Sequence, residues 1–344
     1  MNNLISRHRN LLKVIAIIWI MLYHMNLKTA LPVLGFLQEV GYGGVDIFFF
    51  LAGFGSYYSL DKDDDCLRFM GRKLRSLLPY YIPFILIWMV YKKVVHQIFV
   101  TEIVGNMTMT GYLAGAANQF NWYIDGIIVM YLLAPYIYKL IKRTKNVRLT
   151  GALLVGAALL VSVAFWHTQL LIIATRLPIF VVGMLVARGW GDKSTTMAVF
   201  ISALVTTLLG FAAMYAALNY IDLDRWHYGT WWYPFLVITP GLCVAISWIA
   251  DRLKGGNSST TAMGRACDEL KVSNSGTTAM GRAFDRFSTM TFSLFMWHIF
   301  VFEELQARGE ERPVVWILAF VFVIIWSILY HSAISAIWKK IVKK

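Results

Sequence analysis

The chain has 344 residues, of which 58% are hydrophobic and 15% aromatic, and its formal net charge at pH 7 is +13. Its apolar residues are grouped in runs of about 20, the length that a helix needs to cross a hydrocarbon core, which excludes a soluble globular protein. Because the basic residues collect between these runs, we assign the positive charge to membrane topology and expect no nucleic-acid partner.

The apolar runs predict an all-α membrane helix bundle of about ten transmembrane helices, with residues 1–344 forming a single domain. The predicted spans lie near residues 11–27, 44–60, 77–99, 121–140, 149–166, 170–188, 195–218, 232–250, 287–305 and 314–338. With a cytoplasmic N-terminus, most of the 32 Lys and Arg residues fall on the inner side, in agreement with the positive-inside rule. We therefore expect both termini in the cytoplasm and a multi-pass protein of a cell membrane, the cytoplasmic membrane of a bacterium.

The first predicted span carries two ionisable residues, Lys13 and His24. Ionisable groups are costly in lipid and usually survive there only where they are functional or paired. The 11 residues between them are close to three helical turns, so both side chains share one face, roughly 16 Å apart along the helix axis. Lys13 is expected near the cytoplasm and His24 deep in the outer half of the membrane.

Asp46 opens the second predicted span, which runs antiparallel to the first, so Asp46 falls at a depth similar to that of His24. A carboxylate beside a histidine orients the ring and makes it more basic, as a general base requires. The two residues are therefore a candidate catalytic pair. A lone histidine in a membrane is often only a hydrogen-bonding contact between helices, and for His24 this alternative stays open.

Arg72 and Arg75 stand three residues apart, directly before the third predicted span. On a helix this spacing presents both guanidinium groups on one face, at the inner edge of the membrane. Paired arginines bind phosphate well because each planar fork donates two parallel hydrogen bonds. The alternative is a topology anchor that meets lipid headgroups.

Polar and aromatic residues in later spans are candidate substrate-binding residues. Trp122, Tyr123 and Asp125 begin the fourth span on the outer side, where an acceptor can arrive. The aromatic pair is equally typical of an anchor at the membrane interface. His298 is expected near mid-membrane in the ninth span, either lining the same cavity or bonding to a neighbouring helix. Arg176, Glu303 and Glu304, towards the outer ends of the sixth and ninth spans, are expected in a structural ion pair.

Residues 254–286 are too polar to enter lipid and are predicted to form a cytoplasmic loop. Within it, the segment Thr260–Ala266 recurs 17 residues later as Thr277–Ala283. Two copies are too few for a solenoid, and a local tandem duplication in a tolerant loop is favoured over a binding device.

The three cysteines, Cys66, Cys243 and Cys267, show no paired spacing. Neither a disulfide framework nor a metal cluster is indicated by such a pattern. We expect packing roles for the cysteines and no bound metal.

Five of these patterns, in this order, resemble the motifs of the acyltransferase 3 family of integral membrane acyltransferases. The resemblance covers essentially the whole chain and rests on Lys13 to His24, the run Gly43–Gly53, Arg72-x-x-Arg75 with Pro79, Trp122-Tyr123 with Tyr131 and Pro135, and the run Ser293–His298. Two positions depart from the family pattern, namely Asn10, where an Asp is usual, and Ala52, where a Ser is usual. Neither departure removes a residue predicted here as a site.

The resemblance implies an O-acyltransferase that moves an acyl group from cytoplasmic acyl-CoA, most often acetyl-CoA, to a hydroxyl of a lipid-linked or cell-envelope glycan. It implies that Arg72, Arg75 and Lys13 hold the phosphates of the donor at the inner face. His24 then removes the proton of the acceptor hydroxyl while Asp46 orients its ring, or it assists transfer to another protein group first. The expected partners are acyl-CoA, the saccharide acceptor, membrane lipids and, where the group is passed on, a separate extracytoplasmic transferase.

A proton-coupled secondary transporter or flippase is the alternative function, with Lys13, His24 and Asp46 as its proton relay or substrate site. Against it, the two halves of the chain show no internal similarity, and no Gly- or Pro-broken helices stand at matching positions, as is common in transporters. The arginine pair discriminates between the two functions, because a CoA enzyme needs it for the donor and a transporter needs it only for topology.

Overall fold

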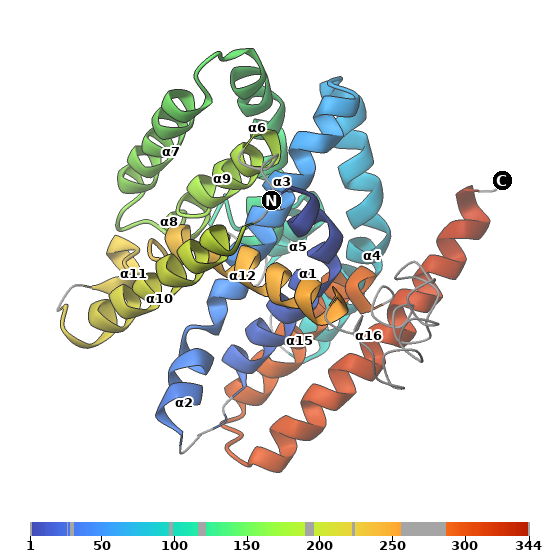
Figure 1. Ribbon diagram of the computed structural model, residues 1–344. Helices are drawn as coiled ribbons and strands as arrows, with labels where there is room; N and C mark the ends of the chain where they lie inside the picture. Colours follow the sequence, from blue (N-terminus) through green and yellow to red (C-terminus); the bar gives the residue numbers. More distant parts are fainter. Residues whose placement is uncertain are drawn as a thin grey trace, which may run out of the picture.

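The computed structural model describes residues 2–25, 27, 31–95, 99–115, 122–189, 196–221, 224–255 and 287–342. Figure 1 shows that these residues form a bundle of helices, and no strand occurs in the described part of the chain. In chain order the elements are α1 (Asn2–His24), α2 (Pro32–Glu39), the 3-10 helix η1 (Gly41–Gly43), α3 (Gly44–Lys62), α4 (Cys66–Val95), α5 (Val100–Thr108), α6 (Trp122–Arg143), α7 (Val147–Ala164), α8 (Leu171–Ala174), α9 (Leu177–Arg188), α10 (Met197–Asn219), α11 (Arg225–Tyr228), α12 (Phe235–Gly255), α15 (Thr291–Ala307) and α16 (Pro313–Val342). The all-α prediction is confirmed, while the predicted repeat lies outside the described residues.

Seven helical stretches are long and apolar enough to cross a membrane: α4, α6, α7, α10, α12, α16 and the stretch Leu171–Arg188, which contains α8 and α9. An eighth is obtained if α2 and the segment Gly41–Lys62, bent from it by 47°, form one span. Two of the ten predicted spans remain, and they fall on α1, which carries basic residues along its first half, and on α15, which has 17 residues. The described helices thus indicate a multi-pass membrane protein with seven or eight such spans, fewer than predicted. The cytoplasmic location of both termini stays a prediction.

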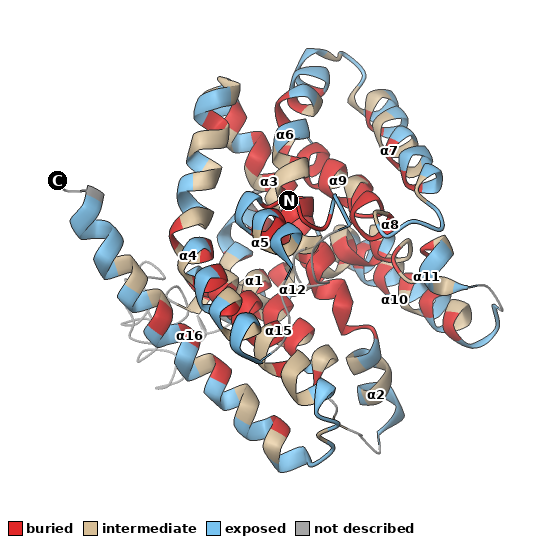
Figure 2. Cartoon of the chain, turned by 180° about the vertical axis from the view of Figure 1, so that it is seen from behind, coloured by how far each residue is buried: buried red, intermediate tan, exposed pale blue. Residues whose placement is uncertain are grey.

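Long apolar faces of the peripheral helices are exposed in this chain. Leu153 of α7, Leu209 of α10 and Leu318 of α16 are 65%, 63% and 63% exposed. Figure 2 shows the contrast with the central helices α3 and α9, on which the buried residues gather. A soluble monomer rarely exposes so much contiguous apolar surface, whereas lipid tails cover such faces readily.

Helices α3 and α9 cross at the centre of the bundle with their backbones in close approach. A Cβ added to Gly53 of α3 would lie 2.1 Å from the carbonyl oxygen of Phe180, and one added to Gly183 of α9 would lie 2.1 Å from that of Phe50. Small residues allow such crossings in membranes, where close packing has to hold the helices together. The same crossing brings the start of α3 beside the residues that precede α9, which is important for the site described next.

Candidate active site

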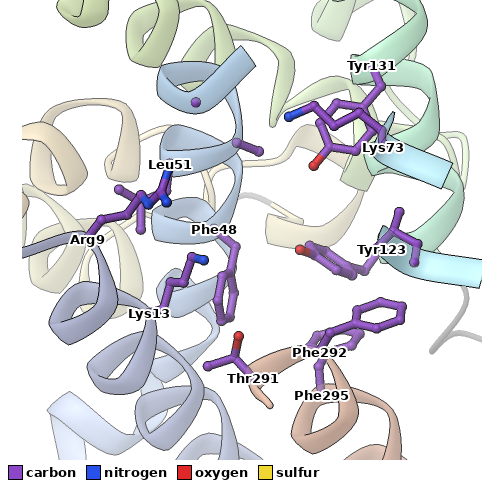
Figure 3. Close-up of a pocket in the computed structure, with 13 residues that line it drawn as sticks. Arg9, Lys13, Phe48, Leu51, Lys73, Tyr123, Tyr131, Thr291, Phe292 and Phe295 are labelled. Atoms are coloured by element: carbon purple, nitrogen blue, oxygen red, sulfur yellow. The ribbon is translucent and has the colours of Figure 1, made fainter. Parts of the chain in front are cut away.

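A cavity of about 260 Å³ opens between α1, α3, α4, α6 and α15, as Figure 3 shows. Three cations line it, Arg9 and Lys13 from α1 and Lys73 from α4. Aromatic rings form much of the remaining wall, namely those of Phe48, Tyr123, Tyr131, Phe292 and Phe295. The described residues that line the cavity include no carboxylate, so its positive charge suits an anionic ligand.

The three cations reach the cavity because of local helix geometry. Arg9 and Lys13 are four residues apart on α1, so they lie on one face, one turn apart. Lys73 extends over the rings of Phe69 and Tyr131, with its Nζ 5.2 and 4.7 Å from their centroids. These aromatic faces attract the ammonium group and hold it at the cavity wall. In Figure 3, Arg9 and Lys73 approach the cavity from opposite sides.

The arginine pair predicted to bind phosphate does not line this cavity. Arg72 and Arg75 are both exposed on α4. Nη1 of Arg72 donates a hydrogen bond of 2.6 Å to Oδ2 of Asp63, and its Nη2 donates one of 3.2 Å to the carbonyl oxygen of the same residue. The hydrogen bond to the carboxylate lowers the pKa of Asp63 below its ordinary value. Arg72 is thus already paired, while Lys73, between the two arginines, faces the cavity.

Arg176 does form an ion pair, but its partner is Asp46, a predicted catalytic residue, and not a glutamate of the ninth predicted span. Oδ1 of Asp46 lies 3.6 Å from Nε of Arg176, and the two side chains are 2% and 1% exposed. The guanidinium group lies over the rings of Trp122 and Trp232, 5.3 and 4.8 Å from their centroids. The predicted contact between Asp46 and His24 is not found among the hydrogen bonds and ion pairs of the described residues, and Oδ2 of Asp46 is buried without a hydrogen-bond partner.

His24 ends α1 and meets His298 of α15. Their ring centroids are 5.4 Å apart, and the ring planes are tilted by 58°. Nε2 of Gln306 donates a hydrogen bond of 2.8 Å to the carbonyl oxygen of His24, so α15 also holds the end of α1. His298 is fully buried, and its Nδ1 lies 2.9 Å from the carbonyl oxygen of Leu294. The fold therefore brings together two predicted site residues from the first and ninth predicted spans.

The three predicted substrate residues at the start of α6 have different surroundings. Tyr123 lines the cavity, and its ring centroid is 4.4 Å from that of Phe295. Trp122 covers the guanidinium group that pairs with Asp46. Asp125 is buried, and its Oδ2 accepts hydrogen bonds of 2.8 and 3.3 Å from two backbone N–H groups of the turn after α5. Only Tyr123 thus faces the cavity, while the contacts of Asp125 hold a turn in place.

Two of the three cavity cations, Arg9 and Lys73, are not among the predicted site residues. Each had a signal in the sequence, since Arg9 stands one helical turn before Lys13 and Lys73 stands between the two arginines. The spacing of charges alone could not show which of these cations lines a cavity, because it does not determine which face of α4 turns towards the bundle.

A family model described as an acyltransferase domain matches residues 10–332. The match spans nearly the whole chain and includes every residue predicted as a site from the sequence, from Lys13 to His298. No curated protein and no solved structure matches the chain.

Proposed function

Since the chain belongs to the acyltransferase 3 family, we propose that it transfers an acyl group, in particular acetyl, from cytoplasmic acyl-CoA to a hydroxyl of a cell-envelope or lipid-linked glycan. Membership of this family implies acyltransferase activity, and therefore an acyl donor and an acceptor. The observation that carries the choice of CoA as the donor carrier is the cavity lined by Arg9, Lys13 and Lys73.

The charge of the cavity supports binding of the phosphate end of CoA. CoA carries a pyrophosphate and a ribose phosphate at one end of a long neutral arm, and phosphates form strong charge-assisted hydrogen bonds with Lys and Arg. The cavity of about 260 Å³ is smaller than the whole molecule, so we assign the phosphates to it and leave the adenosine outside. Arg72 and Arg75, exposed on the helix that carries Lys73, then attract the anionic donor from solution.

We assign His24 as the general base. It lies roughly 16 Å along α1 from Lys13, and the neutral arm of CoA covers this distance when the phosphates occupy the cavity. His24 accepts the proton of the acceptor hydroxyl as the oxygen attacks the thioester carbonyl. The C–S bond breaks, the proton passes from His24 to the leaving thiolate, and the products are an ester and free CoA. Asp46, paired with Arg176, holds the bundle around this centre.

The proposal includes an orientation in the membrane. With α1 and α15 counted as spans, the chain crosses ten times and both termini lie on the cytoplasmic side, as the distribution of basic residues favours. The cavity cations then lie towards the cytoplasm, where acyl-CoA is found, and His24 lies towards the outer side. This orientation suits an acceptor at the surface of a bacterial cytoplasmic membrane.

Label transfer in inside-out vesicles tests the proposal. Vesicles that contain the protein receive CoA with a labelled acetyl group, and the label in lipid and glycan is counted. We expect transfer by the wild type, only a small residual rate by His24→Ala, and transfer by Lys13→Met with Lys73→Met only at raised donor concentration. Lys139→Met is the matched control, because this exposed lysine of α6 does not line the cavity.

Two results would contradict parts of the proposal. The first is that the wild type transfers no label, either from acetyl-CoA or from longer acyl-CoA donors, while substrate uptake into the vesicles depends on His24. The protein would then be a transporter. If the double lysine variant instead behaves like Lys139→Met, the enzyme binds its donor elsewhere than in the cavity.

A further inference from the structure

We propose that His298 positions His24 for catalysis, by accepting a hydrogen bond from the imidazole N–H that His24 does not use as a base. The proposal rests on the function proposed above and adds a positioning residue to it. It gives His298 the role that the sequence predicted for Asp46, whose carboxylate is paired with Arg176.

A histidine that acts as a base needs a partner for its second nitrogen. While one nitrogen takes the proton of the substrate, the other carries a hydrogen, and an acceptor beside that N–H sets the tautomer and the orientation of the ring. In the described structure the hydrogen bond between Gln306 and His24 is made to the backbone carbonyl of His24. It therefore does not occupy the nitrogens of the His24 ring. The ring of His298 lies next to it.

The hydrogen bond of His298 to its own helix determines which of its nitrogens is free. A carbonyl oxygen only accepts, so the Nδ1 atom that lies 2.9 Å from the oxygen of Leu294 is the donor. In the neutral ring the hydrogen is then on Nδ1 and the lone pair is on Nε2. This Nε2 is buried and has no hydrogen-bond partner, which is unusual for a buried polar atom and makes it an available acceptor.

The spacing of the two rings fits an N–H···N hydrogen bond. Two imidazole rings joined by such a bond of about 3 Å have centroids roughly 5 Å apart, because each nitrogen lies about 1 Å from its ring centre. The observed centroid distance of 5.4 Å is close to this value, and the proposed bond is formed by a turn of the His24 ring. His24 is half-buried at the end of α1, whereas His298 is fully buried, so we assign the movement to His24.

Packing holds the His298 ring and connects it to the cavity. Phe295 and Phe302, one turn before and one turn after it on α15, meet the ring edge to face at centroid distances of 5.5 and 5.9 Å. Phe295 also lines the cavity that carries the cations, so the His298 ring packs against a residue of the cavity wall. A donor with its phosphates in the cavity can therefore present its thioester on the side of the bundle where the two histidines meet.

Kinetics of His298 variants separate positioning from packing. His298→Phe keeps an aromatic ring and removes the acceptor, and we expect kcat to fall about 100-fold with an unchanged KM for the donor. His298→Gln places an amide oxygen near the position of Nε2, and we expect it to recover most of this loss. His331→Phe is the matched control, because His331 of α16 stacks on Tyr80 and also has a buried unpartnered ring nitrogen. It should keep the kcat of the wild type.

A double variant tests whether His298 acts through His24. Residues that act as a unit have strongly non-additive effects, so His298→Phe should cause no further loss in a His24→Ala background. Equal fold-losses in both backgrounds, or a wild-type kcat for His298→Phe, would overturn the positioning role and leave the transferase intact. A wild type without transferase activity would refute the proposed function instead.

Nitrogen NMR of histidine-labelled protein in lipid nanodiscs gives a readout that needs no substrate. We expect the ring-nitrogen signals of His24 to shift in His298→Phe, because the tautomer loses its partner, and to stay in place in His331→Phe. Unchanged His24 signals in His298→Phe would show that no hydrogen bond joins the two rings.

Discussion

Two Asp–Arg ion pairs in this chain lie in opposite surroundings. Asp46 and Arg176 meet inside the bundle, where they are 2% and 1% exposed, whereas Asp63 and Arg72 meet at the end of α3 and are 26% and 40% exposed. The exposed partners can each turn to water, but the buried partners have mainly each other. The same pair of residue types therefore serves the fold inside the bundle and forms a weaker, water-exposed contact at the end of α3.

The two ion pairs also change the interpretation of the charges that the sequence pattern singles out. Asp46 and Arg72 both stand next to or inside apolar runs, and both are predicted to do chemistry for that reason. In the structure each has a partner of opposite charge, and the cavity is lined by Lys73 in place of its neighbour Arg72. A charge near lipid is thus informative about function only once its partner is known.

Removal of the buried carboxylate should have the largest effect. Asp46→Asn leaves the charge of Arg176 uncompensated, and we expect the free energy of unfolding to fall by about 3–5 kcal/mol. Asp46→Asn with Arg176→Gln should recover part of this loss, because no charge then stays buried alone. Thermal unfolding in detergent measures both variants, with Asp63→Asn as the matched control. If Asp46→Asn were as stable as Asp63→Asn, burial would not distinguish the two pairs.

The helix crossing that builds the buried pair should be the next most sensitive feature. Gly183→Ala places a methyl group 2.1 Å from the carbonyl oxygen of Phe50, so the backbones must separate, and we expect a destabilisation of about 1–3 kcal/mol. Gly156→Ala on α7 is the control, because no atom lies within 4 Å of its added Cβ. Equal unfolding temperatures of the two variants would mean that α3 and α9 do not depend on their close approach.

The neighbouring cations Arg72 and Lys73 of α4 show the same contrast between a paired, exposed charge and a charge that lines the cavity. Lys73→Met removes a charge from the cavity, and we expect the KM for the proposed donor, acyl-CoA, to rise about tenfold, as loss of one charge-assisted contact does. Arg72→Met removes an exposed charge that is already paired, and KM should change by about twofold at most. The label-transfer assay at varied donor concentration measures both. If Arg72→Met raised KM more than Lys73→Met, the phosphates would be bound by the arginine pair and not in the cavity.

The pH dependence of the exposed pair should be the smallest effect. Because the hydrogen bond from Arg72 lowers the pKa of Asp63, the folded state binds a proton there less readily than the unfolded chain does. The stabilisation is therefore fully present above the ordinary Asp pKa of about 4 and is lost as the pH falls through the lower folded value. Unfolding temperatures of the wild type and of Asp63→Asn should differ slightly at neutral pH and converge in acid. If the two unfolding temperatures still differed at a pH below the pKa of Asp63, the difference would not come from the charge of Asp63.

The helices of this chain are well predicted by local pattern, because the length and periodicity of apolar runs are properties of each segment. Each of the ten predicted runs falls on a helix of the structure, and Lys13 and His24 both lie on α1. The number of spans is predicted less well. Helix α1 carries basic residues in its first half and α15 has only 17 residues, so a criterion of length and apolarity undercounts the helices that carry the candidate site.

By itself the sequence determined that this is an all-α membrane protein, which family motifs it carries, and which helices bear its ionisable residues. Only the tertiary structure decided that Asp46 meets Arg176, that His24 meets His298 and that Lys73 faces the cavity. The physical reason is that helical periodicity sets the direction of a side chain on its own helix. Its partner is set by how distant helices cross, here α3 with α9 and α1 with α15, and that depends on the close fit of side chains along the whole bundle.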